Sequence, residues 1–181
     1  RSNEEAIEVY RKLLLINPKH TDGRIGLALT LAANGNYEEA LLRFDEVLQA
    51  SPDNYDALQG KAHVLRWTGR RAEARAIFES LSSRRPGDPQ NAEALENIAR
   101  AEEEERWAAL RPPAGAPPSD FQAYFQKRLA EYPNDRAAMK GLASAQAQLK
   151  DYPAAIQSYR RVLEVYPDDL TAKSDLARIL S

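Results

Sequence analysis

Two histidines, His20 and His63, are the side chains of this 181-residue sequence best suited to metal binding or acid–base catalysis. Zinc sites need three or four His, Cys or carboxylate ligands at characteristic spacings. The chain has no cysteine, and neither histidine has a second histidine or a carboxylate at ligand spacing. A nucleophile needs an activating base within reach, and one candidate histidine gives little support for such a pair. The sequence therefore predicts no catalytic residue, no metal site, no cofactor and no enzyme activity.

Four consecutive glutamates, residues 102–105, are a second candidate metal cluster. Consecutive residues of a helix project about 100° apart around its axis, so only a subset of these carboxylates can converge. We therefore interpret the run as a solvated helix face.

A basic stretch between residues 61 and 85 allows two interpretations. It comprises Lys61, Arg66, Arg70, Arg71, Arg75, Arg84 and Arg85. These cations could attract an anionic partner. Alternatively, they pair with the carboxylates of the following segment, which include Glu93, Glu96 and residues 102–105. We favour pairing, although some arginines are expected to remain free because surface ion pairs are weak.

Composition excludes several classes of protein. With 25 basic and 27 acidic residues and a net charge of −2, the chain lacks the basic surface of a nucleic-acid binder. No apolar run approaches the roughly 18 residues that span a bilayer, so no direct membrane insertion is expected. The absence of cysteine leaves both cytoplasm and periplasm open. The chain starts at Arg1 without a signal-like segment, and we expect it to be part of a longer protein.

Regularly spaced prolines define an internal repeat. Pro18, Pro52 and Pro86 are 34 residues apart, and so are Pro133 and Pro167. The remaining interval, from 86 to 133, is 47 residues, which is one period of 34 plus an insertion of 13. Fixed periods of this length are typical of repeat architectures.

Each period contains two amphipathic stretches separated by a short turn. Residues 21–54, for example, place Leu27 and Leu31 in the first stretch and Phe44 and Val47 in the second, at spacings of three or four. Glycine in the turns, such as Gly35, can adopt the left-handed conformation that ends a helix. A proline after each pair marks the boundary, since it cannot continue a helix interior. The pattern predicts tandem helix–turn–helix units.

This pattern resembles the tetratricopeptide repeat family, which has small, large, aromatic and proline residues at fixed offsets within 34 residues. Arg24, Lys61 and Gln146 depart from that pattern at single positions. The resemblance implies an all-α fold, a right-handed α-solenoid of tandem antiparallel helix pairs with about ten helices. Residues 1–181 would form a single solenoid fragment. Its parts are the second helix of a truncated unit (1–20), three regular repeats (21–54, 55–88 and 136–169), a degenerate repeat with the 13-residue Pro-rich insertion (89–135) and a terminal capping helix (170–181).

The insertion lengthens the first helix of its unit as far as Leu110. Four prolines between residues 111 and 118 then predict a stiff, extended linker. Ser119 and Gln122 form a capping-box signal for the next helix. The insertion either presents Trp107 and the linker as a binding edge, or is a tolerated surface length variation with Trp107 packed as a brace. We favour the second interpretation.

Family geometry implies that first helices line a concave groove. The residues that would face it are Ile25, Leu29, Gln59, His63, Arg66, Trp67, Glu93, Asn97, Lys140, Ser144 and Gln148. Only Lys140 is cationic among the positions that hold terminal carboxylates in chaperone adaptors, so such a clamp is not expected. Trp67 and Arg66 are residue types enriched in binding hot spots. Alternatively, Trp67 packs on the next helix.

The resulting functional hypothesis is a protein–protein interaction module, an adaptor that binds a peptide or a helix of a partner protein in its groove. The alternative is a periplasmic scaffold or spacer of a bacterial exopolysaccharide-secretion or other envelope assembly. Self-association is compatible with either hypothesis, and nucleic acid is not an expected partner.

Overall fold

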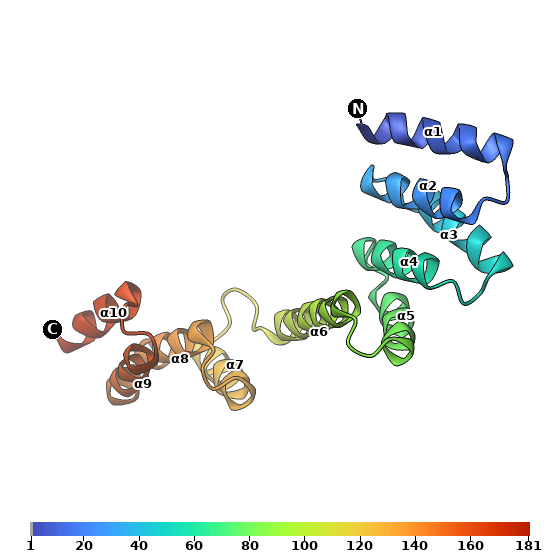
Figure 1. The fold of residues 1–181 in the computed structure, drawn as a ribbon. Helices are drawn as coiled ribbons and strands as arrows, with labels where there is room; N and C mark the ends of the chain where they lie inside the picture. The colour runs from blue at the N-terminus through green and yellow to red at the C-terminus, as the bar shows by residue number, and fades with distance from the viewer. Residues whose placement is uncertain (1) are drawn as a thin grey trace. The chain divides into compact units, whose positions relative to one another are not determined.

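The computed structural model describes residues 2–181, which form ten α-helices and no strand. This confirms the all-α expectation and the expected number of helices. In chain order (Figure 1) the helices are α1 (Ser2–Ile16), α2 (Thr21–Ala33), α3 (Tyr37–Ala50), α4 (Tyr55–Trp67), α5 (Arg71–Arg84), α6 (Pro89–Leu110), α7 (Pro118–Glu131), α8 (Arg136–Gln148), α9 (Tyr152–Val165) and α10 (Leu170–Leu180).

The helices of each pair are separated by tight turns. Gly35 and Gly69 have φ of 83° and 80°, the left-handed conformation expected from the sequence. Lys150 takes the corresponding place between α8 and α9 with φ of 63°, without a glycine. Several helices begin at a residue whose side chain accepts a backbone N–H, which satisfies an otherwise free donor. These caps include His20, Asn54, Asp135, Asp151 and Asp169.

The chain forms two compact units, one ending at Glu102 and the other running from Glu103 to Ser181. The boundary falls inside α6, so this helix contributes its first part to one unit and its last two turns to the other.

In the first unit, α1 to α5 pack in chain order, and α2 also contacts α4 (Figure 1). Alanines at the close approaches, Ala28 and Ala62, have no exposed surface. The rings of Phe44 and Phe78 are also completely buried, each in a cluster that includes residues of the next first helix. Each helix pair is therefore held by its neighbour, as nearest-neighbour packing in repeat proteins requires.

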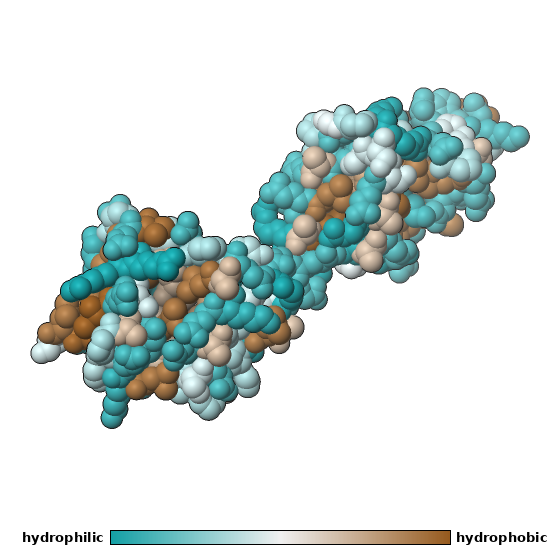
Figure 2. Space-filling model, turned by 90° about the horizontal axis from the view of Figure 1, so that it is seen from below, coloured by the Kyte–Doolittle hydropathy of each residue, from teal (hydrophilic) through white to brown (hydrophobic). Residues whose placement is uncertain are grey.

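The second unit repeats this arrangement with Tyr159, Met139 and Ala143 in its core. One face of α10 packs on α9, where Ala172 is fully buried. Leu180 of the same helix remains 59% exposed. Figure 2 shows apolar surface gathered at the end of this unit where α10 lies.

The insertion differs from the expectation in two respects. The linker is not extended, because the N–H of Ala116 donates to the carbonyl oxygen of Pro113 (3.1 Å) and Gly115 has φ of 88°. A glycine in this conformation closes a tight turn, which reverses the chain between the flanking prolines. The capping-box expectation is also wrong, because α7 already begins at Pro118 and Ser119 donates to Asp120. Proline suits this first helical position because its missing N–H has no partner there.

Candidate partner-binding surface

Three aromatic side chains of the first unit form a shelf, hereafter the aromatic shelf, that consists of Tyr37, His63 and Trp67. The Trp67 ring lies 6.4 Å from that of Tyr37 and 5.9 Å from that of His63, measured between centroids. The His63 ring meets buried Phe78 edge-on at 5.0 Å. Trp67 nevertheless keeps 52% of its surface exposed. The shelf is thus anchored in the core at one end and open to solvent at the other.

A small hollow lies next to the aromatic shelf, between α4 and α6. It has a volume of about 100 Å³, and we call it the Arg66 hollow. Its lining residues are His63, Arg66, Gln90, Glu93, Ala94 and Asn97. Four of the groove residues expected from the sequence therefore come together here, directly beside the fifth, Trp67.

Two polar atoms at the Arg66 hollow lack partners within residues 2–181. The buried Nε of Arg66 and the buried Nδ1 of His63 form no hydrogen bond. Arg66 also forms no ion pair in the described part of the chain. Burial, and then the positive charge of Arg66, lower the pKa of His63 below its usual value, so the imidazole is neutral at pH 7.

The other predicted groove residues of the first unit fall into two groups. Leu29 is 50% exposed and can contribute to a binding surface. Ile25 instead packs in the core with Ile7 of α1 and is only 8% exposed, so it offers a partner almost no surface. Gln59 donates its amide to Asn91, a completely buried side chain (3.0 Å), and thereby joins α4 to α6.

Asn91 belongs to a chain of hydrogen bonds that sequence reasoning missed. Its amide donates to the Tyr55 hydroxyl (2.7 Å), which in turn donates to Asp88 (2.7 Å). Burial, followed by the hydrogen bond to Asp88, raises the pKa of Tyr55. No sequence motif marked these residues, because their partners are more than 30 positions apart.

In the second unit, Lys140 is occupied by an ion pair with the buried carboxylate of Asp169 (3.2 Å). The backbone N–H of Ala172 is the largest of the contacts that lower the pKa of Asp169. The remaining two predicted residues lie on a wider cavity of about 620 Å³. It is lined by Ser144, Ala147, Gln148, Tyr152, Tyr159, Arg178 and Ile179.

The basic stretch is largely paired inside the first unit. Arg75 of α5 forms an ion pair with Glu102 of α6, and Arg70 pairs with Glu73 (2.7 Å). Arg85 stacks over the ring of Tyr55. These contacts support the interpretation of the stretch as structural, with Arg66 as the exception.

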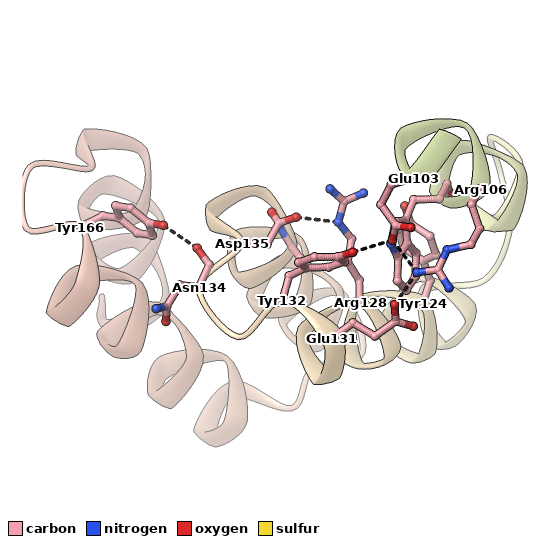
Figure 3. A network of polar contacts seen from close by, with 11 residues as sticks. Glu103, Arg106, Tyr124, Arg128, Glu131, Tyr132, Asn134, Asp135 and Tyr166 are labelled. Carbon is pink, nitrogen blue, oxygen red and sulfur yellow. Dashed lines mark hydrogen bonds and ion pairs between the residues drawn. The ribbon is translucent and has the colours of Figure 1, made fainter. Parts of the chain in front are cut away.

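The last turns of α6 are fixed to α7 by a network around Glu103 (Figure 3). Its carboxylate accepts hydrogen bonds from the Tyr132 hydroxyl (2.6 Å), the Trp107 indole N–H (2.8 Å) and Arg106. These donors, Tyr132 first, lower the pKa of Glu103. Trp107 is only 1% exposed and packs edge-on against Tyr124 at 5.7 Å. Trp107 is therefore an internal brace, and it is not available as a binding edge.

Within residues 2–181, no group of three or more His, Asp or Glu side chains is arranged to hold a metal ion. None of the helices described combines the length and the apolarity that a membrane crossing requires.

Comparison with models of known protein families identifies the family of this chain. Two family models, both described as tetratricopeptide repeat, match it, one over residues 31–98 and the other over residues 1–55 and 122–180. The chain therefore belongs to the tetratricopeptide repeat family, whose fold is a module for protein–protein interaction and whose members are generally non-enzymatic scaffolds.

Two curated relatives are much longer than the stretch that they share with this chain. The poly-beta-1,6-N-acetyl-D-glucosamine export protein of Escherichia coli (strain K12) is 32% identical over 79 residues, which cover 43% of this chain and 10% of that protein. Tetratricopeptide repeat protein 21A of Mus musculus is 30% identical over 115 residues, 54% of this chain and 9% of that protein. The chain spans about a tenth of the length of the curated relatives it matches.

Solved structures share the fold. MamA (41-end) from Desulfovibrio magneticus RS-1 aligns with a TM-score of 0.53 and 19% identity over 93% of this chain and 88% of that one. The TPR2AB domain of yeast Sti1, in its pHSP90 complex, aligns with a TM-score of 0.55 and 16% identity over 98% and 76%. At these identities the likeness establishes the solenoid fold alone.

Proposed function

We propose that this chain is an adaptor module whose first unit binds a peptide or a helix of a partner protein. The observation that carries the proposal is the half-exposed Trp67 beside the unpaired Arg66. Exposed tryptophan and arginine are the side chains that most often dominate binding energy at protein interfaces. The surface proposed for binding consists of the aromatic shelf, the Arg66 hollow and Leu29.

We further propose that Ser144 and Gln148 extend a groove of the same kind on the second unit. Their position on the 620 Å³ cavity supports this assignment. The division into repeats 21–54, 55–88, 89–135 and 136–169 is part of the same proposal, since it assigns α2, α4, α6 and α8 as the first helices. In this scheme α1 is the second helix of a truncated unit and α10 is a cap.

A pull-down from the source cells, followed by titration of the captured partner, tests the proposal. The double substitution Trp67→Ala and Arg66→Ala should weaken binding at least tenfold, which corresponds to about 1.4 kcal/mol. The matched control is Leu42→Ala with Arg100→Ala, which removes an exposed apolar and an exposed cationic side chain from elsewhere in the same unit. If the first double variant binds within twofold of the unsubstituted protein, the proposal is wrong.

A second candidate function is that of a structural spacer in an envelope assembly. It is favoured by the 32% identity to the E. coli polysaccharide export protein, although that similarity covers only 43% of this chain. A chimera separates the two functions. This chain replaces the matching stretch of the E. coli protein, and polysaccharide export is measured with and without the substitutions at Trp67 and Arg66. A spacer tolerates both substitutions, whereas a binding module loses export with them.

A further inference from the structure

Building on the proposed function, we infer that the first unit takes an extended peptide and not a helix. One peptide group of this partner enters the Arg66 hollow, and the apolar side chain of a neighbouring residue lies on the aromatic shelf. Apart from this apolar side chain, the partner needs no particular sequence, because the contacts proposed in the hollow are to its backbone atoms.

The unpaired polar atoms of the hollow favour a partner with free backbone groups. The Nε–H of Arg66 is buried and has no acceptor within residues 2–181, so the donors that a partner can reach are the outer N–H groups of the guanidinium, which form no ion pair there. A partner that covers these outer donors must supply an acceptor, because leaving a buried polar group without a hydrogen bond is costly. An extended peptide carries a free C=O and a free N–H on each residue other than proline. The interior of a helix has already used both groups, so a helix could supply an acceptor only through its side chains or its last turn.

The charges around the hollow favour a neutral dipole over an ion. Arg66 and Glu93 line the same hollow with opposite signs, and they form no ion pair with each other. A carboxylate bound to Arg66 would face Glu93, and an ammonium group bound to Glu93 would face Arg66. A peptide group can present its C=O to Arg66 as an acceptor and its N–H to Glu93 as a donor. Asn97 can complete the contact, because its amide both donates and accepts.

The size of the hollow also favours an extended peptide over a helix. Its volume of about 100 Å³ is small beside the 300–1,000 Å³ of pockets that enclose small-molecule ligands. A helix with its side chains is about 10 Å wide and cannot enter such a space. A single peptide group or a short side chain can.

The aromatic shelf supplies the second contact. Trp67 is 52% exposed, and its neighbour Tyr37 widens the apolar surface at a centroid distance of 6.4 Å. Because His63 lines the Arg66 hollow and also contacts the ring of Trp67, a peptide group held at Arg66 brings the side chain of a neighbouring residue close to the indole. An apolar side chain would be buried there on binding.

Two display libraries of equal diversity distinguish an extended partner from a helical one. The first displays unstructured random 12-residue peptides, and the second displays a stable single helix with one randomised face. Both are selected against residues 1–181. The affinities of the selected clones are then measured for the unsubstituted protein and for single variants.

The variants remove one contact each. Arg66→Met keeps the length of the side chain and removes its donors, and Trp67→Ala removes the shelf. Arg100→Met and Leu42→Ala are the matched controls, and circular dichroism checks that every variant is helical. A further measurement needs no protein variant: each amide of a selected peptide is replaced in turn by an ester, which removes one backbone N–H and weakens the adjoining carbonyl acceptor.

We expect clones from the unstructured library that lose at least tenfold in affinity with Arg66→Met and with Trp67→Ala, and less than twofold with the controls. One ester position should also weaken binding about tenfold. Clones from the helix library alone, with the same dependence on Trp67, would overturn this inference and leave the proposed function intact. Unstructured clones that are indifferent to Arg66 and to every ester would overturn it as well. Failure of both libraries would contradict the proposed function together with the inference.

Discussion

The ring of Phe44 in α3 packs directly on the backbone of Gly60 in α4. A Cβ atom at residue 60 would lie within the van der Waals surface of that ring. The ring of Tyr10 packs on Gly26 in the same way, and the ring of Phe125 packs on Gly141. The glycines that recur in the sequence are therefore the contact points at which each aromatic ring meets the next first helix.

Two further aromatic rings, those of Phe78 and Tyr159, face a residue other than glycine on the next first helix. Phe78 shares its core cluster with Ala94, which stands 34 positions after Gly60. Tyr159 directs its hydroxyl to Asp175, 34 positions after Gly141, at 3.3 Å. The helix-to-helix spacing in each unit thus follows from matching a ring on one helix with a small or hydrogen-bonding residue on the next.

Gly60→Ala should destabilise the protein, although alanine favours a helix over glycine by about 1 kcal/mol. The added methyl group must displace the buried Phe44 ring, and overpacking of this kind costs about 1–3 kcal/mol. Urea unfolding measures the net change. Gly23→Ala is the control, because its Cβ would meet the flexible end of Leu13 at 2.9 Å and the half-buried imidazole of His20 at 3.2 Å, and neither is a ring enclosed in the core. Equal stability of the two variants would show that Phe44 does not pack as described.

Phe44→Ala should lower the free energy of unfolding by about 3–5 kcal/mol, because the ring is completely buried and its removal leaves a cavity. The same substitution at Leu42, two residues earlier on α3 and 54% exposed, should cost less than about 1 kcal/mol. Thermal or urea unfolding of both variants gives the comparison. A loss below about 1 kcal/mol at Phe44 would contradict its place in the core.

Alkaline pH should destabilise the second unit through Tyr159. Burial, followed by the charge of Asp175, raises the pKa of this hydroxyl to about 12. Between pH 10 and 12 the folded protein therefore binds the proton that the unfolded chain has lost, and the free energy of unfolding falls as pH rises. The loss should be about 2 kcal/mol, and Tyr159→Phe should remove it. A Phe variant with an unchanged slope over this range would refute the assignment.

Mild acid should weaken the first unit through His63. Burial and Arg66 lower its pKa in the folded protein, while Glu93 opposes them more weakly. As pH falls below the unfolded value of about 6.5, the unfolded chain takes up a proton that the folded protein does not, so stability decreases. His63→Gln should be less sensitive to pH between 7 and 5 than the unsubstituted protein, with His20 present in both. Identical pH dependence of the two proteins would contradict the described environment of His63.

The helix pairs could be predicted from the sequence because their signals are local and periodic. Proline, glycine and alanine recur at fixed offsets, and each has a local consequence for where a helix ends or how closely two helices approach. The bounds of α2 to α5 follow from these residues. The assignment of His63, Arg66 and Trp67 to the binding surface rests instead on the family resemblance. The three lie close together in α4 because residues three or four apart share a helix face.

The long-range polar contacts could not be predicted in this way. Lys140 was placed in the groove by its position on α8, but its partner Asp169 lies 29 residues further along the chain. The sequence is compatible with either an exposed or a buried Trp107. The ring of Tyr124 in α7, which packs on Trp107 in the structure, distinguishes the two. In the insertion, Gly115 permits the turn that the flanking prolines alone did not indicate.

The most direct test of partner binding at Trp67 uses the two tryptophans of the chain, because one is half exposed and the other is buried. The protein is labelled with ¹⁵N at its indoles and titrated with a peptide selected from the unstructured library. We expect the indole signal of Trp67 to shift saturably while that of Trp107 stays in place, and we expect Arg66→Met to weaken the titration at least tenfold. A signal of Trp67 that remains fixed while the peptide binds would show that the partner docks elsewhere.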